Sequence, residues 1–169
     1  MNEIREIVTR AVVAKGKKVF NLVEKVKTYE KPYSILGCWI INHEFEDSKI
    51  NEVIKLDGEF EVNIWFSTNN NTKTDIIRET ITYKKEIVTK TVVKDYLENT
   101  DDILARIIQH PTVTNAKIID DTVQLDITFE IIAEIIGETK MKVTVFKEVE
   151  NWEEEIDTLD MDINENFLG

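Results

Sequence analysis

The sequence predicts a mainly β protein: an antiparallel β-sandwich or barrel-like domain with one short α-helix and a flexible acidic C-terminal tail. Three observations support this: stretches in which apolar and polar residues alternate, turn-forming residues between them, and a charge distribution that sets the last residues apart. The chain has a net charge of −12, and residues 148–169 hold nine carboxylates and no Lys or Arg. We therefore expect a β-rich self-assembly domain over 1–147 and a disordered docking tail over 148–169.

The N-terminal stretch is ambiguous from its pattern alone. Ile4, Ile7 and Val8 have helical spacing, whereas the β-branched residues that follow are typical of a strand. We expect a strand that breaks at Gly16, because glycine weakens both helices and strands.

Residues 53–66 predict a β-hairpin. Asp57-Gly58 lies between two apolar runs, and this dipeptide readily adopts the positive φ angles of a two-residue turn. The polar run 67–71 ends in three Asn residues, which tolerate left-handed backbone, so a loop is expected there. Strands are expected again over 76–83 and 87–93.

One helix is predicted between Thr100 and His110. Thr100 is a favourable N-cap, and Asp101 and Asp102 suit the positive N-terminal end of a helix. Pro111 is expected to end the helix. Its apolar stripe would consist of Ile103, Leu104, Ile107 and Ile108.

Residues 123–135 alternate between apolar and polar side chains, which predicts a half-buried strand. Ile132 and Ile136 make the second face apolar at its end, so that end should be covered on both sides, by the domain or by another molecule. Gly137-Glu138 predicts a turn, and 141–145 a second strand that completes a hairpin.

Composition excludes several classes of protein. No run of eighteen apolar residues occurs, so no transmembrane segment is expected, and the N-terminus lacks the features of a secretory signal. A lone Cys38 excludes an internal disulfide and fits a reducing compartment such as the cytoplasm. The acidic balance, without a Lys/Arg cluster, argues against nucleic acid as a partner.

The sequence predicts no catalytic, cofactor-binding or metal site. It has two His and one Cys, and no recognisable catalytic or phosphate-binding motif. Cys38 and His43 would lie on opposite faces of a shared strand, because five residues separate them. We interpret Cys38 as a small buried side chain, His43 as a hydrogen-bonding residue at a strand end, and His110 as a residue at the helix end.

The tail combines its carboxylates with apolar residues, a pattern typical of disordered docking segments. Its proposed docking residues are Trp152, Ile156, Leu159 and Phe167. A tail that only keeps the protein soluble is the alternative, and the sequence leaves both open.

Several segments share the motifs of one family. The clearest is 34–43, Ser-Ile-Leu-Gly-Cys-Trp-Ile-Ile-Asn-His, and 5–16 is a second. Shorter matches lie at 63–67, 71–74, 137–140, 152–154 and 162–168. In these segments the chain resembles the outer spore coat morphogenetic protein family, coat protein E (CotE), of endospore-forming Bacillus and Clostridium relatives. It departs from the family pattern over 17–31 and 84–93 and in its shorter tail.

The resemblance implies a structural protein and not an enzyme. Such a protein is made in the mother-cell cytoplasm, collects on the forespore, and becomes part of the outer coat layer of the spore. It implies self-association linked to the N-terminal part, and recruitment of other spore coat and coat-morphogenetic proteins linked to the acidic tail. No cofactor and no catalytic residue is implied.

The apolar strand ends suggest where copies would meet. Our candidates for the self-assembly interface are Trp39, Ile131, Ile132, Ile135 and Ile136. Two alternatives remain. One is a β-sandwich that binds a small ligand or glycan between its sheets, with Trp65 and Tyr83 as a platform. The other is a hydrolase that uses His43 with a carboxylate.

Overall fold

The structure, a computed structural model, describes residues 2–97 and 101–146. The chain forms two compact units, Thr9–Thr139 and a smaller one made of Met1–Val8 with Lys140–Gly169. The whole tail, 148–169, and with it the predicted docking residues, lies outside the described part of the chain.

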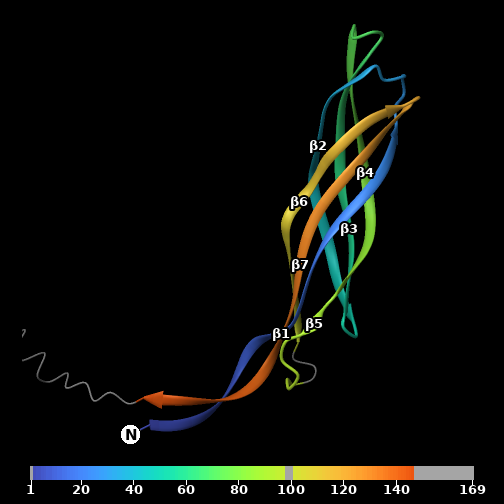
Figure 1. Cartoon of the computed structure of the whole chain (residues 1–169). Helices are drawn as coiled ribbons and strands as arrows, with labels where there is room; N and C mark the ends of the chain where they lie inside the picture. The colour runs from blue at the N-terminus through green and yellow to red at the C-terminus, as the bar shows by residue number, and fades with distance from the viewer. Residues whose placement is uncertain (1, 98–100, 147–169) are drawn as a thin grey trace, which may run out of the picture. The chain divides into compact units, whose positions relative to one another are not determined.

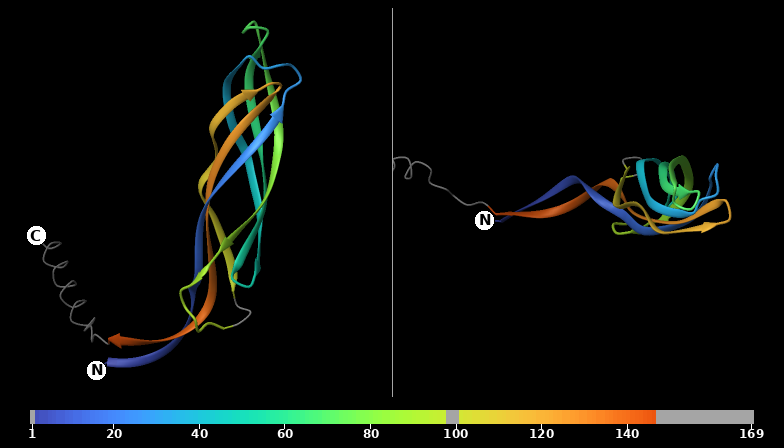
Figure 2. Two further views of the ribbon diagram at one scale, coloured as in Figure 1. Left: turned by 45° about the vertical axis from the view of Figure 1, so that its right-hand side comes forward. Right: turned by 90° about the horizontal axis from the view of Figure 1, so that it is seen from above.

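Seven strands make up the secondary structure of the described residues (Figure 1). They are β1 (Asn2–Lys27), β2 (Ser34–Ile50), β3 (Val53–Thr68), β4 (Lys73–Val88), β5 (Lys90–Thr91), β6 (Asp102–Ile119) and β7 (Thr122–Phe146). They form one sheet of order β5-β1-β7-β6 and another of order β2-β3-β4. Within Thr9–Thr139 the two sheets face each other (Figure 2). The prediction of a mainly β, antiparallel protein is confirmed.

The strand pairs run antiparallel. β2 pairs with β3, β3 with β4, and β6 with β7 in antiparallel registers. For β1 and β7, Thr9 contacts Thr139 and Asn21 contacts Thr128, so residue numbers increase along one strand as they decrease along the other. These two strands are therefore antiparallel too. β2, an edge strand of one sheet, lies beside β6, an edge strand of the other.

The core fills the space between the sheets with the inward-facing side chains of β3 and β7. Alternate residues of both strands are almost fully buried, as the alternation over 123–135 predicts. Burial of each large apolar side chain stabilises the fold by roughly 1.5–3 kcal/mol. The largest of them include Phe60, Phe66, Phe129, Ile54, Leu56, Leu125 and Ile127.

The predicted helix at 100–110 is wrong, because residues from Asp102 onward form β6. The same residues also alternate: Ile103, Ala105 and Ile107 pack against the core, and β6 pairs with β7 throughout. Asp102 is held by Arg10 at 2.6 Å, and Asp101 forms an ion pair with Lys49. The two carboxylates therefore bind cationic side chains and do not cap a helix.

The expected turns at Asp57-Gly58 and Gly137-Glu138 and the expected break at Gly16 are wrong too. β3, β7 and β1 run through these positions without interruption, and no described glycine has a positive φ. The strands expected over 76–83 and 87–93 are likewise mostly one strand, β4, followed by the short β5. The left-handed residues are all Asn or Asp, whose short polar side chains tolerate this conformation. They are Asn42, Asn51, Asn69, Asn70, Asn71 and Asp120.

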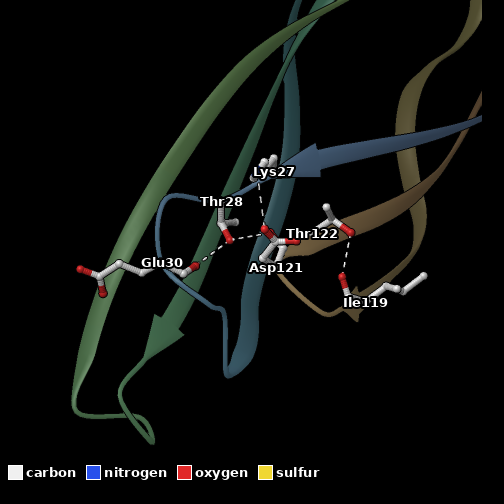
Figure 3. Close-up of polar contacts among 6 residues, drawn as sticks. All are labelled: Lys27, Thr28, Glu30, Ile119, Asp121 and Thr122. Atoms are coloured by element: carbon white, nitrogen blue, oxygen red, sulfur yellow. Dashed lines mark hydrogen bonds and ion pairs between the residues drawn. The ribbon is translucent and has the colours of Figure 1, made fainter.

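The three Asn residues before β4 lie in the β3–β4 connection, as predicted, whereas Ser67 belongs to β3. A further connection is fixed by hydrogen bonds between the end of β1 and the β6–β7 turn (Figure 3). The buried Thr28 donates its backbone N–H to Asp121 O at 3.1 Å, and its hydroxyl lies 2.6 Å from Glu30 O and 3.0 Å from Asp121 O. Lys27 adds an ion pair with Asp121 at 3.8 Å.

Candidate assembly surfaces

The smaller unit exposes apolar side chains on a pair of strand segments. Its described residues are two strand segments, 2–8 of β1 and 140–146 of β7, which lie side by side (Figure 1). We call this pair the terminal ribbon. Ile4 is 71% exposed and Phe146 is 72% exposed, and Val8 and Met141 are also exposed. A two-stranded ribbon is marginally stable by itself in water, so this element has both the surface and the energetic reason to bind another molecule.

A second exposed apolar surface lies on the outer face of the β2-β3-β4 sheet. The register places Trp65 between Gly37 and Ile76, and Asn63 between Trp39 and Arg78. Residues opposite each other in antiparallel strands share a face. We call Trp39, Ile41, Trp65 and Ile76, which are all exposed, the indole patch.

One polar side chain lies within this patch. Asn63 is only 2% exposed although it belongs to the outer face, and its side-chain Nδ2 has no hydrogen-bond partner. A buried donor without a partner costs about 1–3 kcal/mol. The indole patch therefore combines stacking surfaces with an unsatisfied amide donor.

The strand edges differ in regularity. β2 has register shifts at Ile35/Gly37 and Ile41/Glu44, and β6 has shifts on both sides of Pro111. β4 pairs with β3 from one end to the other without a shift, and among the described residues no strand pairs with its second edge, although Gly16 of β1 packs against the Val88 carbonyl at the end of β4. We call this free side of β4 the β4 edge.

His43 is part of an aromatic cluster and not of a catalytic pair. Its Nε2 lies 2.6 Å from the Tyr83 hydroxyl, and its ring packs against Phe45, Phe60 and Phe129. Burial lowers the pKa of His43, with a further lowering from the charge of His110. Burial also raises the pKa of Tyr83 to about 12, so both groups are neutral at pH 7. The hydrolase alternative needs a carboxylate on His43, and the hydrogen bond there goes to a phenol.

Cys38 packs against the core from β2, and burial raises the pKa of its thiol. A thiol held protonated is a poor nucleophile. His43 faces the same interior, contrary to the expectation of opposite faces, because the irregularity between Ile41 and Glu44, with left-handed Asn42, shifts the alternation by one residue. His43 thus lies at a bulge within β2 and not at a strand end, and His110 lies in β6 and not at a helix end.

Within residues 2–97 and 101–146, no group of three or more His, Cys, Asp or Glu side chains is placed to hold a metal ion. The same part of the chain contains no helix long and apolar enough to cross a membrane.

Comparison with known families identifies the family of the chain. The family model for outer spore coat protein E (CotE) matches residues 3–168, nearly the whole chain. The chain belongs to the CotE family. CotE proteins are structural proteins of the outer spore coat, so the resemblance found in the sequence is confirmed. No curated protein and no solved structure gives a significant match.

The CotE interface candidates from the sequence fall into two groups. Trp39 is exposed in the indole patch, and Ile132 and Ile136 are half-buried on the outer face of β7. Ile131 and Ile135 are 0% and 2% exposed in the core, so they offer no surface to a second copy, and we withdraw them as candidates. Sequence reasoning missed the terminal ribbon and the β4 edge, because neighbour relations between strands decide both.

Proposed function

We propose that this CotE-family protein is a morphogenetic scaffold. It is made in the mother-cell cytoplasm, assembles with copies of itself around the forespore, and recruits outer-coat proteins through its acidic tail. The observation that carries the self-assembly is the terminal ribbon, whose apolar side chains are exposed. Among the described residues no third strand pairs with either of its two strand segments, 2–8 and 140–146.

Apolar burial favours a second copy on this element. Ile4, Val8 and Phe146 each add roughly 1–3 kcal/mol when a partner covers them, since about 25 cal/mol is gained per Å² of apolar surface removed from water. A ribbon from another copy supplies the same kind of surface, as in a symmetric interface in which the same patch meets itself.

The tail serves a different role in this proposal. Residues 148–169 hold nine carboxylates and no Lys or Arg, and in this proposal the apolar residues among them serve as anchors. Trp152, Ile156, Leu159 and Phe167 remain our proposed contacts for other coat proteins.

The ribbon is tested by Ile4→Lys, with Ile4→Leu as a matched control that keeps an apolar side chain at the same position. Sedimentation velocity of the full chain should show multimers for the native protein and for the control, and a marked loss of mass for Ile4→Lys. Multimers of native size in Ile4→Lys would exclude the ribbon. A native protein that stays monomeric at high concentration would refute the scaffold itself.

Deletion of residues 148–169 separates the two roles. The shortened chain should form the same multimers and lose the binding of outer-coat proteins in a pull-down with purified candidates. Should the shortened chain become monomeric, the division between domain and tail is wrong.

A binding module remains a second candidate because of Asn63. Tyr83 is buried and cannot join a platform with Trp65, and the core fills the space between the sheets, so any ligand would lie on the indole patch instead. Quenching of tryptophan fluorescence by soluble oligosaccharides, lost in Trp65→Ala, would support this function.

A further inference from the structure

We propose that the β4 edge pairs with the β4 edge of a second copy, antiparallel, about a twofold axis at Thr82. The two β2-β3-β4 sheets would then form one continuous sheet across two copies. This inference rests on the proposed self-assembly and names one of its interfaces.

The β4 edge lacks most of the features that protect free edges. Natural sheets protect them with bulges, prolines, short strands or inward-pointing charges. β4 is sixteen residues long, contains no proline, and keeps an unbroken register with β3. In contrast, β2 is bulged, and β6 has both bulges and Pro111. The protective features left to β4 are Glu79 and Lys85, which occupy inward-facing positions of the strand.

Symmetry limits how two β4 strands can pair. A twofold axis perpendicular to the sheet keeps each side chain on the same face of the sheet. The residue at the axis therefore lies opposite the same residue of the second copy. An axis at Arg78, Glu79, Lys84 or Lys85 places like charges opposite each other, which is destabilising. An axis at Ile81 places Arg78 opposite Lys84, again two cations.

An axis at Thr82 places opposite charges together. Arg78 of each copy then faces Glu86 of the other, and Glu79 faces Lys85, so both pairings occur twice. Glu79 and Lys85, the inward-facing charges that disfavour other registers, therefore form opposite-charge pairs when the axis lies at Thr82. An axis at Thr80 is the nearest rival, but among its charged residues only Asp75 and Lys85 face each other.

These side chains are available in the structure. Across residues 2–97 and 101–146, no ion pair engages Arg78, Glu79 or Lys85. Glu86 lies 3.9 Å from Lys55, so an arriving Arg78 would give it a second cation. At the end of β4 the Val88 carbonyl lies against Gly16 of β1, where a Cβ would come within 2.5 Å of it, so the pairing is confined to residues 77–87.

The energy of this interface is shared between backbone and side chains. Each cross-strand side-chain pair contributes little by itself, so the ion pairs mainly select the register while backbone hydrogen bonds hold the strands. A twofold interface closes after two copies, and a coat layer therefore needs at least one other contact, for which the terminal ribbon is available.

Disulfide trapping tests the register. Opposed residues in antiparallel strands have Cα atoms about 4.5–5.5 Å apart, a separation that a disulfide spans. In the full chain with Cys38→Ser, Thr82→Cys should cross-link into covalent dimers under mild oxidation, and the matched control Thr80→Cys should not. Cross-linking of Thr80→Cys alone would overturn the axis at Thr82.

Charge reversal tests the pairing independently. Arg78→Glu and Glu86→Arg should each weaken dimer formation at least tenfold, because each places like charges opposite one another twice. A mixture of the two variants should form mixed dimers, since both facing pairs are then of opposite sign. Lys84→Glu, on the same face but opposite Thr80, should change dimer formation little. Failure of the mixture to recover would refute the pairing.

The outcomes separate this interface from self-assembly as a whole. If the protein forms multimers but neither Thr82→Cys nor Thr80→Cys cross-links, the β4 pairing is wrong and the proposed scaffold function is unaffected. A native chain that is monomeric in sedimentation velocity would overturn both.

Discussion

Gly58 provides the sharpest test of the fold, because the sequence and the structure give it different roles. The sequence predicts a turn at Asp57-Gly58, in which glycine supplies a positive φ. In the structure Gly58 lies within β3, opposite Phe45 on one side and Tyr83 on the other. A Cβ at Gly58 would lie 2.5 Å from Tyr83 Cζ and Oη, so the missing side chain makes room for the tyrosine ring.

Gly58→Ala should therefore destabilise the protein by displacing Tyr83. Overpacking of a core costs typically 1–3 kcal/mol. Displacement also breaks the 2.6 Å hydrogen bond to His43, and a buried polar group left without a partner adds about 1–3 kcal/mol. Together these predict a loss of about 2–6 kcal/mol, or roughly 4–24 °C in melting temperature at about 2–4 °C per kcal/mol.

The assay is urea unfolding of four proteins: native, Gly58→Ala, Tyr83→Leu, and the double variant. If the ring causes the loss, Gly58→Ala should cost little in the Tyr83→Leu background, which gives a large coupling energy. Gly37→Ala is the matched control, because a Cβ there meets only Trp65 Cε3, at 4.0 Å. An equal cost of Gly58→Ala in both backgrounds would refute the overlap with Tyr83 and favour a turn.

Two further predictions concern hydrogen bonding and pH. Thr28→Val should lower the free energy of unfolding by about 1–2 kcal/mol, because it removes a buried hydroxyl that bonds Glu30 O. Thr122→Val, at a half-buried residue whose hydroxyl bonds Ile119 O, should cost less, and equal losses from the two variants would contradict the role of burial. For His43 the folded-state pKa is lowered, so the unfolded chain binds the proton first. Stability should therefore be full above pH 6.5 and fall as the pH drops toward the folded-state value, by at most about 1.4 kcal/mol per pH unit. His43→Phe should flatten this dependence in urea titrations from pH 7 to 5, and an unchanged slope would assign it to other groups.

The strands of the core were predictable from alternation alone. Over 123–135 the apolar positions of the sequence are the buried positions of β7, because a strand places successive side chains on opposite faces. The same alternation is present over 103–107, where capping residues and Pro111 suggested a helix instead. Residues 103–107 form a strand because they pair with β7, and this pairing is not a local property of these residues.

Glycine was the least predictable residue. Local preference places glycine at turns, yet Gly16, Gly58 and Gly137 lie within strands where a Cβ would approach Val88 O, Tyr83 or Tyr96 within 3 Å. Asn and Asp take the left-handed positions instead. A close approach between distant segments cannot be deduced from the residues beside the glycine.

The candidate surfaces show the same division. Trp39 was found from sequence as an aromatic residue in a strand, but its neighbours in the indole patch come from β3 and β4. Ile131 and Ile135 lie on the buried face of β7 that the alternation predicts, whereas Ile132 and Ile136 stay half-buried on the other face, so only the second pair offers surface to a second copy.

The sequence by itself determined the class of fold, the family and the separation of an acidic tail, because composition and period-two alternation are properties of the chain as written. Tertiary structure alone decided which strands became edges, which glycines admit a neighbouring ring, and which apolar residues stay exposed. These depend on contacts between residues far apart in the chain, and free edges and exposed side chains are what remains once those contacts are made.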